Sequence, residues 1–145
     1  MANWLGNAFT FIQNPTAVLF SGGSNVTLSN TAGTSTTLCT TTAIPSGSYL
    51  FTCNFTLAPS TATGWNTDEF FIVNLGGGVC YSTGAPYYLS DETGTSAQVI
   101  LSMSGVITLS TSQTISVTCV RNGNLSTNKF GAVLSITYTK LSTPL

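Results

Sequence analysis

The stretch Gly47-Ser48-Tyr49-Leu50-Phe51-Thr52-Cys53-Asn54-Phe55-Thr56-Leu57 alternates between two kinds of residue. Because the side chains of a β-strand point alternately to the two faces of its sheet, this alternation predicts a strand over residues 48–57. Its core-facing residues are Tyr49, Phe51, Cys53, Phe55 and Leu57. Its outward row is Leu50, Thr52, Asn54 and Thr56. The outward row holds no charged residue.

The same alternation occurs in two later segments, 113–120 and 131–138, each of which we predict to be a strand. The inward sets are Ile115, Val117 and Cys119 in the first, and Ala132, Leu134, Ile136 and Tyr138 in the second. The outward sets are Thr114, Ser116, Thr118 and Val120, and then Val133, Ser135 and Thr137. These outward rows again lack charge.

The rest of the chain continues as short strands separated by clusters of Gly, Pro, Asn and Ser. We expect strands near 16–20, 25–29, 35–40, 69–75, 78–82, 97–103 and 105–109. No window keeps the 3.6-residue period of a helix. The chain is therefore predicted to be an all-β sandwich or barrel of about ten short strands. Residues 16–145 form one domain, and residues 1–15 are either a tether or a first strand.

Charged residues are scarce, with three Lys+Arg, four Asp+Glu and no His among 145 residues. Soluble domains carry about 25 % charge. The net charge of −1 provides no basic surface for nucleic acid or anionic lipid. No run of 18 apolar residues exists, so no membrane span is expected. The usual proton-transfer groups are few, which argues against an enzyme.

No metal or cofactor site is expected from the remaining motifs. The chain has no His and no CxxC pair, which argues against zinc. The acidic pairs Asp68-Glu69 and Asp91-Glu92 either bind Ca²⁺ with loop carbonyls or keep their loops solvated. Their spacing matches no calcium-binding loop, which favours the second interpretation.

The uncharged outward rows have two interpretations. A monomer normally places Lys or Glu on such strands, partly to block pairing with other chains. The rows therefore indicate a subunit interface, although a hydroxyl-rich face in water would also suit Thr in strands. The predicted interface residues are Thr52, Asn54, Thr56, Val133, Ser135 and Thr137.

Several of these segments resemble the C1q/TNF-like jelly-roll family. The matching segments are Gly47-Ser48-Tyr49-Leu50-Phe51, Ser104-Gly105-Val106-Ile107-Thr108-Leu109 followed by Gln113–Val120, and Phe130-Gly131-Ala132-Val133-Leu134. The resemblance implies a ten-strand jelly-roll sandwich that assembles as a homotrimer. It also implies that binding takes place at apical loops or at grooves between subunits.

The low charge and the segment Ile44-Pro45-Ser46-Gly47-Ser48-Tyr49-Leu50 are similar to head domains of phage fibres and to capsid spikes of large DNA viruses. This likeness implies a non-enzymatic protein of the virion surface. Its partners would be its own copies, other virion proteins and a host receptor or glycan. The alternative is a cellular, extracellular C1q/TNF-like or lectin-like binding module.

Aromatic residues in or near predicted loops are the candidate contacts for such a receptor or glycan. They are Tyr87 and Tyr88, with Trp65 and Tyr81 as further candidates. Aromatic rings stack on sugars and anchor protein contacts. The segment Pro86-Tyr87-Tyr88-Leu89 is preferred because Gly and Pro bound it. Alternatively, these rings cap the end of the sandwich.

Four cysteines are present: Cys39, Cys53, Cys80 and Cys119. Cys53 and Cys119 alternate with core residues, so both are predicted to be buried. They are either free thiols that act as small apolar residues or the two halves of a bridge across the core. The start of the chain lacks the basic and apolar regions of a secretory leader, which favours free thiols.

Overall fold

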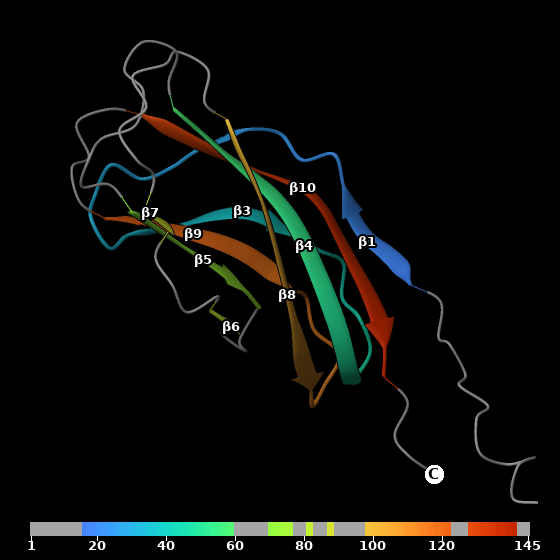
Figure 1. Ribbon diagram of the computed structural model, residues 1–145. Helices are drawn as coiled ribbons and strands as arrows, with labels where there is room; N and C mark the ends of the chain where they lie inside the picture. Colours follow the sequence, from blue (N-terminus) through green and yellow to red (C-terminus); the bar gives the residue numbers. More distant parts are fainter. Residues whose placement is uncertain are drawn as a thin grey trace, which may run out of the picture.

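The computed structural model describes residues 16–59, 70–76, 81–82, 87–88, 98–122 and 128–141. These residues form ten strands in two antiparallel sheets, and none of them lies in a helix (Figure 1). The strands are β1 (Ala17–Ser21), β2 (Val26–Thr27), β3 (Ser35–Thr40), β4 (Gly47–Pro59), β5 (Phe70–Leu75), β6 (Tyr81–Ser82), β7 (Tyr87–Tyr88), β8 (Val99–Leu109), β9 (Ser116–Asn122) and β10 (Lys129–Lys140). The predicted all-β sandwich is confirmed.

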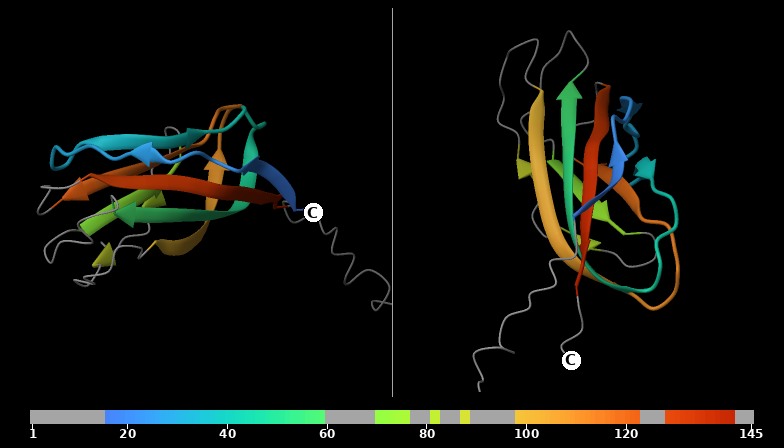
Figure 2. Two further views of the ribbon diagram at one scale, coloured as in Figure 1. Left: turned by 90° about the horizontal axis from the view of Figure 1, so that it is seen from above. Right: turned by 90° about the vertical axis from the view of Figure 1, so that its right-hand side faces the viewer.

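The two sheets lie face to face as separate layers (Figure 2). The front sheet has the order β1-β10-β4-β8, and β2 also pairs with β10. The back sheet has the order β3-β9-β5-β6, and β7 also pairs with β5. The long strands β4, β8 and β10 all belong to the front sheet, which is therefore the larger continuous surface.

The pairing of the strands is nested, like that of a long hairpin rolled up on itself. The outermost pair is β1 with β10, and inside it lie β3 with β9 and β4 with β8. At the centre, β5 pairs with both β6 and β7. This nested order in two sheets is that of a jelly roll, an architecture common in viral capsid and lectin domains.

The core lies between the sheets, and the alternation in β4 determines which residues of that strand enter it. All five predicted core residues of β4 are at most 2 % exposed. From the back sheet, Val73, Val117 and Cys119 pack into the same cluster. The inward and outward assignment of the 48–57 and 113–120 segments is therefore confirmed, apart from Thr56, which is also buried.

The predicted alternation of 131–138 was wrong at three residues, of which Ala132 lies opposite the outward Thr56 instead of on the core side. Val133 is fully buried, and Leu134 is 39 % exposed, although the alternation predicted the reverse. A β-bulge is the reason: Val133 pairs with Phe55 and Ser135 pairs with Asn54, so that Leu134 is an extra residue in β10. An inserted residue reverses the side of every residue on one side of it, which a strict period of two cannot follow.

Three strand boundaries also differ from the prediction. The segments 97–103 and 105–109 form one strand, β8, because Gly105 pairs with Phe51 within an unbroken ladder. Strand β9 begins at Ser116, and Gln113 forms only an isolated bridge with Ile44. Strand β7 was not predicted at all. The predicted tether, residues 1–15, lies outside the described residues.

Candidate interaction surface

The outward residues of the front sheet form four rows that cross β10, β4 and β8. Cross-strand partners share one face of a sheet, so the register assigns each row directly. The rows are Thr139, Leu50 and Val106; Thr137, Thr52 and Ser104; Ser135, Asn54 and Ser102; and Ala132, Thr56 and Ile100. We call these twelve residues the outer face. None of them is charged, and none is aromatic.

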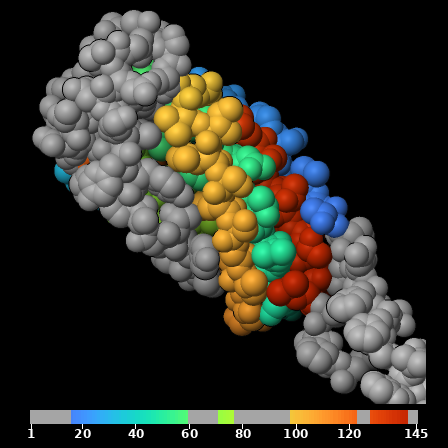
Figure 3. Space-filling model, in the orientation of Figure 1, coloured from blue at the N-terminus to red at the C-terminus, as the bar shows by residue number. Residues whose placement is uncertain are grey.

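Three aliphatic side chains are exposed on this outer face. Ile100 is 70 % exposed, Val106 is 54 % exposed and Leu50 is 42 % exposed. Figure 3 looks onto the front sheet, where the atoms of β8, β4, β10 and β1 form parallel bands. Burying these aliphatic groups against another protein would gain hydrophobic free energy of about 25 cal/mol per Å².

Some polar groups of the front sheet are already hydrogen-bonded to one another. Asn54 Nδ2 donates to Ser135 Oγ at 3.0 Å. The Thr139 hydroxyl shares a hydrogen bond of 2.9 Å with the Thr16 hydroxyl. Ser48 and Thr108, just beyond the row of Leu50 and Val106, share another of 2.9 Å. Because a polar group costs free energy on burial mainly when it loses its partner, these internal pairs lower the cost of covering the sheet.

The predicted interface residues fall into two groups. Thr52, Asn54, Ser135 and Thr137 are half-buried members of the outer face. Thr56 is only 2 % exposed, and Val133 faces the core because of the bulge. The exposed aliphatic residues Leu50, Ile100 and Val106 were not among the predicted interface residues. Alternation in β4 already placed Leu50 outward, whereas Ile100 and Val106 needed the register of β8.

The predicted aromatic loop is partly a strand. Tyr87 and Tyr88 form β7, where Tyr87 pairs with Phe71 and Tyr88 pairs with Phe70. Tyr81 belongs to β6 and pairs with Leu75. All three residues therefore lie along β5 at one edge of the back sheet, and the prediction of a free loop at 87–88 was wrong. Trp65 lies outside the described residues.

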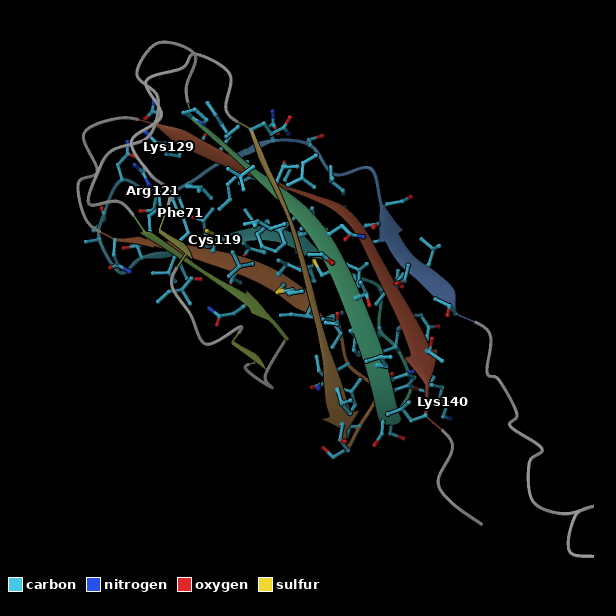
Figure 4. The ribbon with its side chains drawn as sticks, in the orientation of Figure 1. Phe71, Cys119, Arg121, Lys129 and Lys140 are labelled. Atoms are coloured by element: carbon cyan, nitrogen blue, oxygen red, sulfur yellow. The ribbon has the colours of Figure 1, made fainter. Side chains whose placement is uncertain are left out.

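Two of the three cations are buried, although all three lie at or next to a strand end. Arg121 is 1 % exposed and Lys129 is 0 % exposed. Arg121 Nη1 donates to Asn30 Oδ1 at 2.6 Å, and Asn30 Nδ2 donates to Asn128 Oδ1 at 2.7 Å. Figure 4 shows both cations at one end of the sandwich and Lys140 at the other. Lys140 is thus the only exposed cation of the described residues.

The three described thiols are buried and free, namely Cys39, Cys53 and Cys119. Burial, with a smaller contribution from the neighbouring Cys39, raises the pKa of Cys53 to about 12. Burial also raises the pKa of Cys119 to about 12, against an opposing effect of Arg121. The free state predicted for Cys53 and Cys119 is confirmed, whereas Cys80 lies outside the described residues.

Among the described residues, no group of three or more His, Cys, Asp and Glu could hold a metal ion. All four carboxylate side chains of the chain lie in segments outside the description. No helix in the described part of the chain is long and apolar enough to cross a membrane.

Comparisons with known proteins relate the fold to a viral capsid. No protein-family model and no curated protein matches the chain. The structure of T=1 particles derived from infectious bursal virus is similar to this chain, with a TM-score of 0.57 and 12 % sequence identity. The similarity covers 87 % of this chain and 31 % of the capsid chain. The structure of the Gx strain of infectious bursal disease virus is similar as well, with a TM-score of 0.55 and 13 % identity. That similarity covers 90 % of this chain and 33 % of the viral chain.

The structure of the Gt strain of the same virus has a TM-score of 0.54 and 11 % identity to this chain. The similarity covers 88 % of this chain and 32 % of the viral chain. Our chain thus spans about a third of the length of these structures. At such identities the likeness shows a shared fold. The resemblance to C1q/TNF-like proteins stays a prediction, since no family model matches.

Proposed function

We propose that this protein is a non-enzymatic structural component of a virion surface, a fibre head or capsid spike, which assembles as a homotrimer. The observation that carries the proposal is the outer face, which combines exposed aliphatic side chains with uncharged polar residues and holds no charged residue. Such a face is suited to burial against sister chains, because it presents no charge, and its amide Asn54 already donates to Ser135 within the sheet.

Two further observations support this role. The nested jelly-roll order is the architecture of many capsid domains, and the structural likeness to a birnavirus capsid protein agrees with it. The composition supports a non-enzymatic role, because the chain has no His and only two adjacent carboxylate pairs. Fold likeness alone does not assign function, so the assembly itself must be measured.

The assembly is tested by sedimentation at micromolar concentration. We expect the wild-type chain to sediment as a trimer and Leu50→Lys to raise the trimer dissociation constant by about a hundredfold, roughly 2.7 kcal/mol. Leu50 is exposed in the single chain, so the Lys side chain reaches solvent there but is buried without a counter-charge in the trimer. Thr37→Lys, on an exposed position of β3, is the matched control and should leave the trimer intact. A clean wild-type monomer contradicts the proposal.

Host attachment would use the aromatic edge of the back sheet. Tyr87 pairs with the fully buried Phe71, whereas Tyr88 pairs with Phe70. We therefore expect Tyr87→Ser to lower the free energy of unfolding by about 2 kcal/mol or more. Tyr88→Ser should change it by less than about 0.5 kcal/mol and should weaken binding to host cells or glycans about tenfold.

Denaturant unfolding and a glycan array provide the two measurements. A Tyr88→Ser variant that binds as tightly as the wild type would remove this residue from the contact. If the wild-type protein binds no host surface, its role would be that of a purely structural component of the shell. Strong binding to a defined free glycan, together with no assembly onto virions, would instead favour the alternative of a lectin-like or C1q/TNF-like module.

A further inference from the structure

Three of the four sheet edges carry features that discourage pairing with another chain. In the front sheet, β1 is five residues long and has a bulge between Val18 and Phe20. In the back sheet, β3 has a bulge between Thr37 and Cys39, and the opposite edge is divided between two-residue strands, β6 and β7. Short strands and bulges are common ways in which natural proteins protect an edge.

The fourth edge, β8, has none of these features. It is eleven residues long and pairs with β4 in a ladder without a register shift. Its sequence, Val99-Ile100-Leu101-Ser102-Met103-Ser104-Gly105-Val106-Ile107-Thr108-Leu109, contains no charged residue and no Pro. Within the part of the chain that the structure describes, β8 pairs on one side only. Such a strand is a template for adding another strand.

We propose that two copies of the chain join through β8, antiparallel and centred on Ser104, so that two front sheets become one continuous sheet. An antiparallel pair of identical strands has a twofold axis, which makes the contact self-complementary. In this register Met103 opposes Gly105 of the second copy, and Leu101 opposes Ile107 of the second copy. A long side chain thus meets a glycine, and two aliphatic side chains meet each other.

The register also preserves the two faces of the sheet. Each inward residue of β8 opposes an inward residue of the second copy, and Ser102 opposes the outward Val106 of the second copy. A shift by one residue would place core side chains opposite solvent-facing ones and is therefore disfavoured. A second copy is the favoured occupant because β8 carries no charge, so that identical strands meet without repulsion between like charges.

This contact is separate from the proposed trimer. The trimer uses the outer face, whereas the edge contact uses the backbone N–H and C=O groups of β8. If both contacts form, the assembly contains an even number of chains, such as two trimers joined edge to edge. If the outer face does not associate, the edge contact alone gives a dimer.

A cysteine cross-link tests the edge contact and its register. In a Cys80→Ser background, Ser104→Cys places two thiols directly opposite each other, at the Cα separation of about 4.5–5.5 Å that suits a disulfide. Under mild copper-catalysed oxidation by air, more than half of the chains should become covalent dimers on a non-reducing gel. The three described native thiols are buried, so they are not expected to contribute.

Two matched variants separate this contact from other modes of association. Ser102→Cys lies on the same strand and face, but its counterpart is about 13 Å away in the proposed register, so cross-linking should fall about tenfold. Thr52→Cys lies beside Ser104 on β4 and reports contact through the outer face. Equal cross-linking of Ser104→Cys and Ser102→Cys, or none of Ser104→Cys, overturns the proposal. Strong cross-linking of Thr52→Cys alone would support the trimer and refute the edge contact.

Discussion

Cys53 and Cys119 place two neutral thiols in the interior between the sheets. An unfolded thiol loses its proton near pH 9, whereas burial raises the pKa of each folded thiol to about 12. The folded chain therefore holds more protons than the unfolded chain between these two values. Stability from this source is fully present below about pH 9 and is lost as the pH rises towards 12.

We expect the free energy of unfolding to fall above pH 9, with each thiol contributing up to about 1.4 kcal/mol per pH unit. Urea unfolding at several pH values between about 8 and 11 measures the slope. The double variant Cys53→Ala, Cys119→Ala should have lower stability at pH 8 but a flatter slope. An unchanged slope in that variant would mean that other groups cause the alkaline loss.

The alternation of a strand predicts which of its residues are buried, but it does not predict their hydrogen-bond partners. Arg121 stands two residues after Cys119, so the period of two places it inward, and the structure buries it. It lies next to the end of β9. The residue that accepts its hydrogen bond, Asn30, is 91 positions away in the sequence. A single sequence does not indicate such a distant contact.

At the scale of the strand, the bulge in β10 decides which side chains reach the core. It lies between Val133 and Ser135 and leaves Leu134 unpaired with β4. Strand existence was predictable from residue types and turn clusters, but the bulge was not, because no Gly or Pro marks it in the sequence. The two-residue strand β7 escaped prediction for a related reason, since it is too short to show a period.

A pair of substitutions to Thr tests the bulge. Val133→Thr places a hydroxyl in the core and should cost about 1–3 kcal/mol of the free energy of unfolding. Leu134→Thr changes an exposed residue and should cost less than about 0.5 kcal/mol. Strict alternation predicts the opposite ranking. Chemical denaturation of both variants at equal concentration therefore distinguishes a bulged β10 from a regular one.

At the scale of the molecule, the described surface is unusually neutral. Two of three cations are buried, and the outer face carries no charge. Composition alone predicted the neutrality, and the family resemblance predicted the jelly roll. Neither predicted that β8 would be the unprotected edge, because that required the order of the strands in the sheet.

Self-association should therefore depend little on salt. Between about 0.1 M and about 1 M ionic strength the Debye length falls from about 10 Å to about 3 Å, which screens exposed charge pairs strongly. We expect the trimer dissociation constant to change by less than about threefold over this range, as measured by sedimentation. A rise of tenfold or more would indicate ion pairs at the subunit contact, and the acidic pairs Asp68-Glu69 and Asp91-Glu92 would be the first residues to replace.

The pairing of β1 with β10 has a consequence for modularity. Ala17 lies opposite Tyr138, and the hydroxyls of Thr16 and Thr139 are 2.9 Å apart, so the polypeptide enters and leaves the sandwich at neighbouring points (Figure 1). A domain with this geometry can be spliced into a surface loop of a host protein through two short joints, with little distortion of either partner. The sandwich can thus be inserted as one unit into surface loops of unrelated proteins.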